Sequence, residues 1–145
     1  SEAGCPAVAD PGANLVALAQ ARNIPVVPLV GPSSLLLSLM ASGLNGQCFA
    51  FHGYLPAKDP DRQKALRDLE GDQEEAANQI FIETPYRNQA LFDTLLKTCS
   101  PQTRLTVATD LTLPEESIKT RPIGAWKKET PPEFERRPTV FLILA

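Results

Sequence analysis

Residues 79–109, QIFIETPYRNQALFDTLLKTCSPQTRLTVAT, decide the fold, because two apolar segments flank an amphipathic one. The segments QIFIE and RLTVAT are short, rich in β-branched and aromatic residues, and bounded by polar turns, which predicts two buried strands. Between them Leu91, Leu95 and Leu96 recur at core spacing, which predicts a helix over residues 87–99. The stretch is therefore a strand, a helix and a second strand, the order that is typical of an α/β domain.

The alternation of strands and helices continues on both sides of this unit. We expect a helix ending at Arg22, a buried strand over 24–29, helices over 35–42 and 61–70, a strand over 49–53, a weaker edge strand over 116–121, a polar surface excursion over 126–137 and an apolar strand over 139–144. Because the last three predicted strands have no comparable helices between them, the sheet is expected to contain antiparallel pairs as well as parallel ones. The prediction is a layered α/β domain with a mixed, mostly parallel sheet flanked by helices.

Length and composition exclude several classes of protein. The chain has 145 residues, of which 43% are hydrophobic, so one domain with a buried core is expected. Pro and Gly interrupt every apolar run before it reaches the length of a membrane span, and no segment resembles a signal peptide. Cys5, Cys48 and Cys99 lie far apart and the chain has one His, so we expect no disulfide framework, no metal site and a reducing cytoplasm.

Charge and the first residue add two expectations. The net charge of −3 argues weakly against a nucleic acid as the partner of this chain alone, although it leaves room for a local basic patch. The chain begins with Ser1 on a turn rich in Gly and Pro, which predicts that it is a fragment of a longer protein.

Three loops rich in small residues could hold a ligand. They are Ser1–Gly12, Gly31–Ser34 and Glu83–Arg87. In an open α/β sheet, ligands bind beyond the carboxyl ends of strands, where helix N-termini offer free N–H donors. The local pattern alone favours plain tight turns, since Gly, Pro and Ser are common in turns.

The side chains that could do chemistry each have a structural alternative. The chain contains no phosphate-binding loop, dinucleotide fingerprint or zinc-protease motif. His52 is expected to be a partly buried, hydrogen-bonded structural residue, and Ser33 a helix cap. Glu83 and Asp110 each follow an apolar strand, where site residues are expected. Arg87 lies four positions beyond Glu83, and both an ion pair that holds the turn and a contact to substrate stay open.

Six segments occur in the order and approximate spacing of one enzyme family. They are SEAGCPAVADPG (1–12), VVPLVGPSS (26–34), FHGYLPAK (51–58), IFIETPYR (80–87), VATDLT (107–112) and PTVFLIL (138–144). One such segment is a weak signal, but six in order, spread from residue 1 to residue 144, are a strong one. In them the chain resembles the tetrapyrrole methylase superfamily, most of all the branch that methylates a ribose 2′-hydroxyl in small-subunit ribosomal RNA.

The resemblance implies a two-domain enzyme that holds S-adenosylmethionine (SAM) in the cleft between α/β domains and is generally a homodimer. Residues 1–12 would then be a loop from the interdomain region that lines the cofactor cleft. Residues 13–145 would be the C-terminal domain of the tetrapyrrole methylase fold, with the N-terminal domain absent and the fragment inactive by itself. Matched motif by motif, the resemblance implies that Arg87 contacts the substrate. It implies that the residues that bind SAM are Gly4, Cys5, Pro6, Val8, Ser33, Ser34, Glu83, Thr84 and Asp110.

Mechanism leaves the substrate open. Methyl transfer from SAM needs no metal, and positioning of the nucleophile supplies much of the rate. A ribose hydroxyl benefits from a general base, for which Glu83, Asp110 and His52 are the candidates. Asp110 and Leu113 stand where the RNA branch has Glu and Lys, and Thr109 where it has Arg. Methylation of a ribosomal RNA ribose is the first hypothesis, and the loss of basic residues motivates the alternative of a tetrapyrrole or other small-molecule substrate. A non-catalytic dimerisation or binding module is the third possibility.

Overall fold

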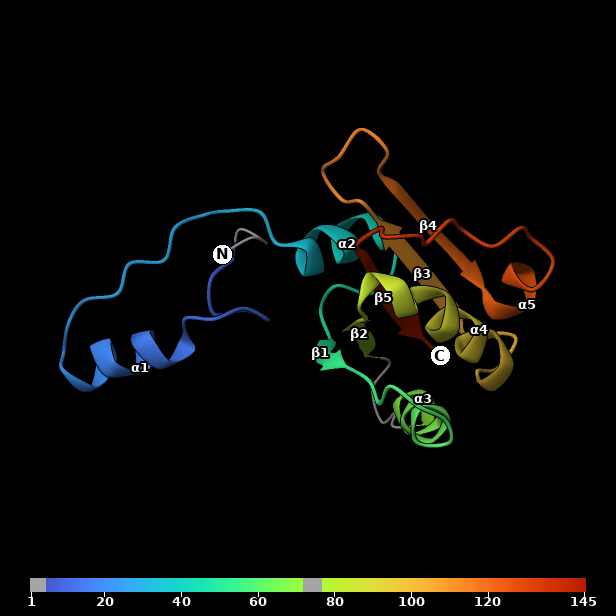
Figure 1. The fold of residues 1–145 in the computed structure, drawn as a ribbon, viewed down its shortest axis with the longest axis horizontal. Coiled ribbons are helices and arrows are strands. Elements are labelled where there is room, and N and C mark those ends of the chain that lie inside the picture. Colours follow the sequence, from blue (N-terminus) through green and yellow to red (C-terminus); the bar gives the residue numbers. More distant parts are fainter. Residues whose placement is uncertain (1–4, 72–76) are drawn as a thin grey trace.

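The computed structural model describes residues 5–71 and 77–145, in which five strands form one sheet. In chain order they are β1 (Phe49–Tyr54), β2 (Asn78–Ile82), β3 (Arg104–Thr109), β4 (Ser117–Pro122) and β5 (Thr139–Leu144). Their order in space is β1-β2-β5-β3-β4, so the last strand occupies the centre of the sheet (Figure 1). Every residue of β5 is buried, which is why this segment is apolar throughout.

The prediction of a mixed sheet is confirmed, but the expectation that most pairs are parallel is wrong. Only β1 and β2 pair in parallel, whereas β5 is antiparallel to both of its neighbours and β4 is antiparallel to β3. β1, β2 and β3 do point the same way, because both β2 and β3 run opposite to β5. The insertion of β5 between β2 and β3 turns what would be a parallel pair into two antiparallel ones.

Helices cover both faces of the sheet. On one face lies α2 (Ser34–Ser42), which contacts β4 and β5, and on the other lie α3 (Asp61–Gly71), α4 (Asn88–Thr98) and the short α5 (Ile123–Trp126) (Figure 1). Because successive side chains of a strand point to opposite faces of the sheet, those of β5 alternate between two core clusters. Val140 and Leu142 of β5 pack in one cluster with Leu39 of α2, while Phe141 and Ile143 pack with the apolar side chains of α4.

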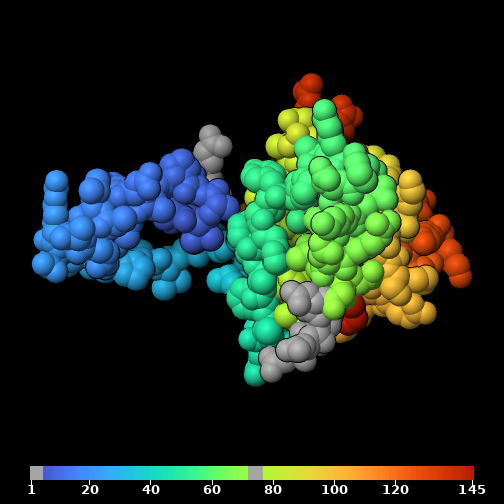
Figure 2. Space-filling view, turned by 90° about the horizontal axis from the view of Figure 1, so that it is seen from below, coloured from blue at the N-terminus to red at the C-terminus, as the bar shows by residue number. Residues whose placement is uncertain are grey.

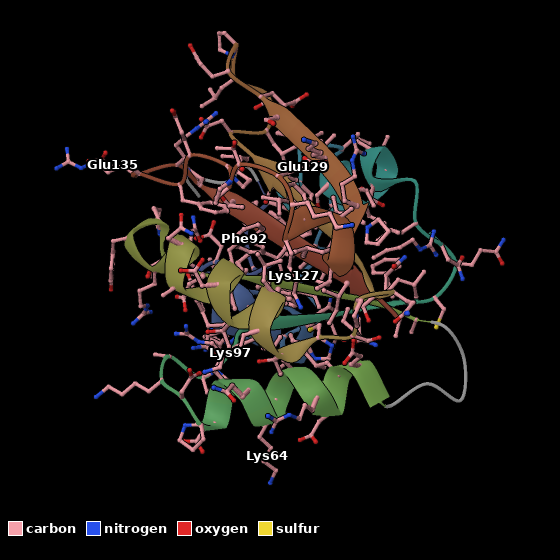
Figure 3. The ribbon with its side chains drawn as sticks, turned by 90° about the vertical axis from the view of Figure 1, so that its right-hand side faces the viewer. Lys64, Phe92, Lys97, Lys127, Glu129 and Glu135 are labelled. Carbon is pink, nitrogen blue, oxygen red and sulfur yellow. The ribbon has the colours of Figure 1, made fainter. Side chains whose placement is uncertain are left out.

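Aromatic side chains fill the core on the α4 side. Phe81 of β2 stacks on Phe141 of β5 with ring centroids 6.1 Å apart, and Phe92 of α4 meets the edge of Trp126 at 5.5 Å. The Trp126 Nε1–H donates a hydrogen bond to the Leu105 carbonyl oxygen, so its one polar atom is satisfied. Phe134 is buried as well, so the segment predicted to be a surface excursion contributes to the core. Figure 3 shows Phe92 inside this layer and Lys64 of α3 pointing away from it.

The first described part of the chain lies outside the layers. Residues 5–33 form an arm that contains α1 (Ala13–Ala21) and projects from the body where it meets α2 (Figures 1 and 2). None of the side chains of α1 is buried. The arm therefore exposes apolar residues of its helix and of the segment after it, including Leu15, Leu18, Ile24, Val27, Leu29 and Val30.

The predicted buried strand over residues 24–29 is wrong. The segment has no strand structure, and Leu29 is 88% exposed. Pro25, Pro28 and Pro32 remove three backbone donors within nine residues, so the segment cannot form a continuous ladder with the sheet. Its β-branched residues therefore gave a strand signal without the hydrogen-bonding capacity of a central strand.

Candidate functional site

The carboxyl ends of β1, β2 and β3 meet at one edge of the sheet. Because Ile82 pairs with Val140 and Thr109 with Thr139, the residues that follow β2 and β3 flank the start of β5. Two strand spacings separate them, roughly 10 Å. This places Glu83 and Asp110, two of the predicted site residues, at the same edge, as expected for an α/β fold.

Glu83 is a buried carboxylate inside a network of arginines. Its side chain is 2% exposed, and its Oε1 accepts hydrogen bonds from the Thr84 backbone N–H at 2.7 Å and from Arg87 Nε at 3.0 Å. A 3₁₀ turn over Pro85–Arg87 brings Arg87 back over the carboxylate. The ion pair that holds the turn is therefore present, whereas a contact of Arg87 to substrate stays a prediction.

Arg62 of α3 is part of this network, although the sequence reasoning missed it. Its side chain is buried, and its Nη2 lies 3.9 Å from Glu83 Oε2. It also donates hydrogen bonds to the carbonyl oxygens of Pro56 and Ala57 in the connection between β1 and α3. A signal was available in the sequence, since Arg62 lies four positions before Leu66 and hence on the apolar face of the helix.

Asp110 is held by an arginine from a distant segment. Its Oδ2 accepts a hydrogen bond from Arg137 Nε at 2.6 Å, and its backbone N–H donates to the Pro138 carbonyl at 3.0 Å. Asp110 has φ of 52°, in the left-handed region that Asp tolerates at some cost. Thr112 and Arg136 in the two adjoining segments also have positive φ, 72° and 55°. Strained backbone thus gathers around this ion pair.

Arg137 connects four segments of the chain, and no local sequence signal marks it. Its Nη2 donates to the Glu115 carbonyl at 2.8 Å, and its own carbonyl accepts from Asn88 Nδ2 at the start of α4 at 2.9 Å. Asn88 is fully buried and its Oδ1 has no partner in the described structure. The partners of Arg137 lie up to 49 positions away in sequence, so they could be identified only from the fold.

The predicted cofactor residues of the N-terminal loop lie in the arm. Gly4 is outside the described residues. Cys5 is half-buried, and Pro6 and Val8 are exposed. Among the described residues, no recorded hydrogen bond joins these positions to Glu83 or Asp110. The structure therefore brings together the predicted residues from β2 and β3, but not those from the arm.

Ser33 and Ser34 lie at the N-terminus of α2, where the arm enters the body. Ser33 is the N-cap residue, as expected, but its hydroxyl makes no capping hydrogen bond. Both serines are half-buried. The free N–H groups of the first helical turn and two hydroxyls thus lie at the junction between arm and body.

The remaining candidate groups are less suited to catalysis. His52 of β1 is exposed rather than partly buried, and its Nε2 hydrogen-bonds Gln79 Oε1 on β2 at 2.5 Å. Burial above all, and the nearby charge of Glu70, raise the pKa of the Cys99 thiol to about 12, against the opposing charge of Lys127. Cys99 therefore stays protonated and unreactive at neutral pH.

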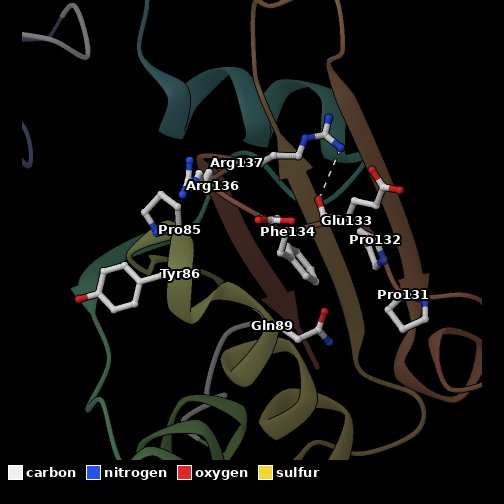
Figure 4. Close-up of a pocket in the computed structure, with 10 residues that line it drawn as sticks. Pro85, Tyr86, Gln89, Pro131, Pro132, Glu133, Phe134, Arg136 and Arg137 are labelled. Carbon is white, nitrogen blue, oxygen red and sulfur yellow. Dashed lines mark hydrogen bonds between the residues drawn. The ribbon is translucent and has the colours of Figure 1, made fainter.

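A pocket of about 950 Å³ opens beside the Glu83 network, between the start of α4 and residues 131–137 (Figure 4). Tyr86 and Gln89 line one side, and Pro132, Glu133 and Arg136 the other. Within residues 5–71 and 77–145, no cluster of side chains has the composition of a metal site, and no helix is long and apolar enough to cross a membrane.

The chain has similar proteins both in sequence and in fold. No family model matches the chain. The ribosomal RNA small subunit methyltransferase I of Escherichia coli O157:H7 is 34% identical over 147 aligned residues, which cover 99% of this chain and 50% of that protein. The chain thus spans about half the length of the curated relatives it matches.

Solved structures share the fold. The methyltransferase CobJ matches 97% of this chain and 61% of its own, with a TM-score of 0.59 and 21% identity. A uroporphyrin-III C-methyl transferase from Thermus thermophilus, complexed with S-adenyl homocysteine, matches 97% of this chain and 62% of its own, with a TM-score of 0.51 and 19% identity. In sequence the chain is similar to small-subunit ribosomal RNA methyltransferases, and in fold to methyltransferases of known structure, as its resemblance to the tetrapyrrole methylase superfamily predicts.

Proposed function

We propose that this chain is the C-terminal domain of a SAM-dependent methyltransferase that methylates a ribose 2′-hydroxyl of small-subunit ribosomal RNA. The observation that carries the proposal is the similarity along 99% of the chain to a protein named as a small-subunit ribosomal RNA methyltransferase. In this proposal residues 1–12 line the interdomain cofactor cleft and residues 13–145 form the C-terminal domain, with the N-terminal domain absent.

The chemistry of the edge described above fits a cofactor that carries an amino acid, a ribose and an adenine. Such a ligand needs acceptors for its N–H and O–H groups and donors for its carboxylate. Glu83 and Asp110 each keep one oxygen that accepts no recorded hydrogen bond among the described residues, and Asn88 Oδ1 is buried without a partner. We assign to the cofactor, from the body, Ser33, Ser34, Glu83, Thr84 and Asp110 and, from the arm, Gly4, Cys5, Pro6 and Val8.

The chain's own residues act chiefly by positioning. SAM supplies a methyl group that is already electrophilic, so alignment of the hydroxyl with the methyl–sulfur bond is the main requirement, a contribution of about 7–11 kcal/mol at best. Glu83 and Asp110 are each engaged by arginine, and an engaged carboxylate is better suited to orienting a ligand than to accepting a proton. We therefore favour an orienting role for both over that of a general base.

A second candidate function is methylation of a tetrapyrrole or another small molecule. It is favoured by the structural likeness to a protein named as a uroporphyrin-III C-methyl transferase and by the absence of the basic residues expected after β3. A third is a non-catalytic dimerisation or binding module. It is favoured because, within the described part of the chain, the cofactor residues predicted in the arm make no recorded hydrogen bond to Glu83 or Asp110 at the edge of the sheet. If it is right, this chain alone transfers little or no methyl.

Calorimetric titration with SAM tests the cofactor assignment, on the protein made with any further sequence that its gene encodes. We expect binding, weakened about tenfold by Asp110→Asn, because one charge-assisted hydrogen bond contributes about 1.5 kcal/mol. Glu115→Gln, an exposed carboxylate in the same region, should bind like the unaltered protein. An absence of heat at millimolar SAM contradicts the proposal.

Mapping of ribose methylation in the small-subunit RNA of a deletion strain separates the two substrates. Loss of one 2′-O-methyl group, restored by the intact gene, supports the RNA substrate. An unchanged methylation pattern, with methyl transfer to a tetrapyrrole in vitro, supports the second candidate. We further propose a homodimer in the cytoplasm, which size-exclusion chromatography with light scattering and cell fractionation would test.

A further inference from the structure

The pocket between α4 and residues 131–137 is built from chemical groups that recognise an unpaired nucleobase. Its walls are the apolar rings of Pro85 and Pro132 and the aromatic ring of Tyr86, and its polar groups include Gln89 and Glu133 (Figure 4). Its volume of about 950 Å³ is at the upper end of the range of small-ligand pockets and is large enough for one nucleotide.

Tyr86 is placed as a stacking platform. The residue is 78% exposed, although it lies in a turn that the buried Glu83 holds. The guanidinium of Arg87 lies 5.2 Å from the centre of the Tyr86 ring and is itself bound to Glu83. Arg87, which Glu83 holds in place, therefore orients the Tyr86 ring. A base that stacks on this ring meets an aromatic surface whose orientation is fixed before binding.

The charges of the pocket favour contact with a base over contact with the phosphate backbone. Arg137 lines the pocket but is bound to Asp110, and Glu133 and Glu135 add negative charge. Arg136 is the one lining cation for which the described structure records no ion pair. Gln89 Nε2 donates one hydrogen bond to Asp93 Oδ1 at 2.9 Å, so Gln89 Oε1 and the carboxylate of Glu133 are the acceptors that suit the N–H groups on a base edge.

We propose that this pocket binds one unpaired base of an RNA substrate, stacked on Tyr86, with Arg136 on its phosphate. The inference rests on the proposed function, which supplies a strand of RNA as the ligand. Tyr86 follows Glu83 by three residues, so the bound base would lie beside the edge to which we assign the cofactor. Sequence-specific recognition of RNA characteristically uses splayed, unpaired bases stacked on aromatic rings.

The test is the affinity for a fluorescein-labelled single-stranded RNA of mixed sequence, measured by anisotropy with the same full protein. Tyr86→Ala should weaken binding about 5- to 150-fold, the range for loss of one aromatic–base stack, and Tyr86→Phe should restore it. Tyr54→Ala is the matched control, because this second tyrosine is also exposed, at 61%, and lies on β1 outside the pocket. Arg136→Gln should reduce the salt slope of log K by about 0.7, the value for one phosphate contact.

The proposal is overturned if Tyr86→Ala binds RNA like the unaltered protein, if Tyr86→Phe loses as much as Tyr86→Ala, or if Tyr54→Ala loses equally. It is also overturned if Tyr86→Ala weakens binding of a porphyrin but not of RNA. SAM titration of Tyr86→Ala keeps the two proposals apart. If Tyr86→Ala binds SAM, methylates RNA and has unchanged affinity for RNA, only the pocket proposal is rejected. If the unaltered protein itself does not bind SAM, the proposed function is rejected.

Discussion

At the scale of the residue, the candidate site depends on carboxylates that arginines hold in place. Glu83 is enclosed by Arg62 from α3 and Arg87 from the turn after β2, and Asp110 by Arg137 from the segment before β5. A buried ion pair contributes little over an apolar pair, but removal of one partner leaves the other charge buried and uncompensated. The arginines therefore fix the geometry of the edge more than they add to its stability.

Replacement of Glu83 tests this enclosure. Glu83→Gln should lower the free energy of unfolding by about 3 kcal/mol, because the buried Arg62 then lacks its counter-charge. Urea denaturation measures the change. Glu115→Gln, at an exposed carboxylate, should change it by less than about 0.5 kcal/mol. In the double variant Arg62→Met with Glu83→Gln part of the loss should return, and a purely additive loss would show that the two side chains do not interact.

At the scale of the element, β5 determines how the sheet is assembled. Its position between β2 and β3 joins the two parts of the sheet, and its alternate side chains enter both core clusters. Phe141 lies between Phe81 and Phe134, at centroid distances of 6.1 and 6.0 Å. The strand thus links the site edge to α4, which begins at Asn88 directly after the turn that carries Tyr86.

Truncation of the central ring tests the role of β5. Phe141→Ala should lower the free energy of unfolding by about 3–5 kcal/mol, through lost transfer energy and the cavity that remains. Leu113→Ala, at an exposed position after β3, should have an effect of less than about 0.5 kcal/mol. Thermal or urea unfolding compares them. Similar losses in the two variants would contradict the central placement of β5.

At the scale of the whole molecule, the body and the arm differ in what stabilises them. The body has two core clusters on a shared sheet, whereas α1 of the arm has no buried side chain. Figure 2 shows the arm projecting from the body. The body leaves the apolar residues of the arm exposed, Leu15 and Leu29 among them. Hydrophobic stabilisation scales with area removed from water, so the arm contributes little to folding of the body.

Deletion of the arm tests this separation. A chain that begins at Pro32 should unfold at the same urea concentration as the full 145 residues, because it keeps α2 and both clusters. The matched control lacks residues 139–145 and should not fold, since β5 supplies both neighbours with their hydrogen-bond partner. A stability loss above about 2 kcal/mol on removal of residues 1–31 would show that the arm packs on the body.

Much of the fold could be predicted from local patterns. The helices over 34–42, 61–71 and 88–98 and the strands over 78–82, 104–109 and 139–144 lie within one or two residues of their predicted bounds. The failure at residues 24–29 has a physical cause, since hydrophobic pattern reports burial but not whether prolines leave enough donors for a ladder. The order of strands was not predictable, because the apolar pattern of β5 indicates that both of its faces are buried but does not indicate which strands it pairs with.

The sequence by itself determined most of the element types, the α/β class and the placement of Glu83 and Asp110 after strands. These depend on side-chain period, turn residues and motif order, all of which act over a few neighbouring positions. Only the tertiary structure decided that β5 lies between β2 and β3, that Arg62 and Arg137 hold the carboxylates, and that Tyr86 faces a pocket. Those contacts join positions 21 to 64 residues apart, and they form only when the layers pack.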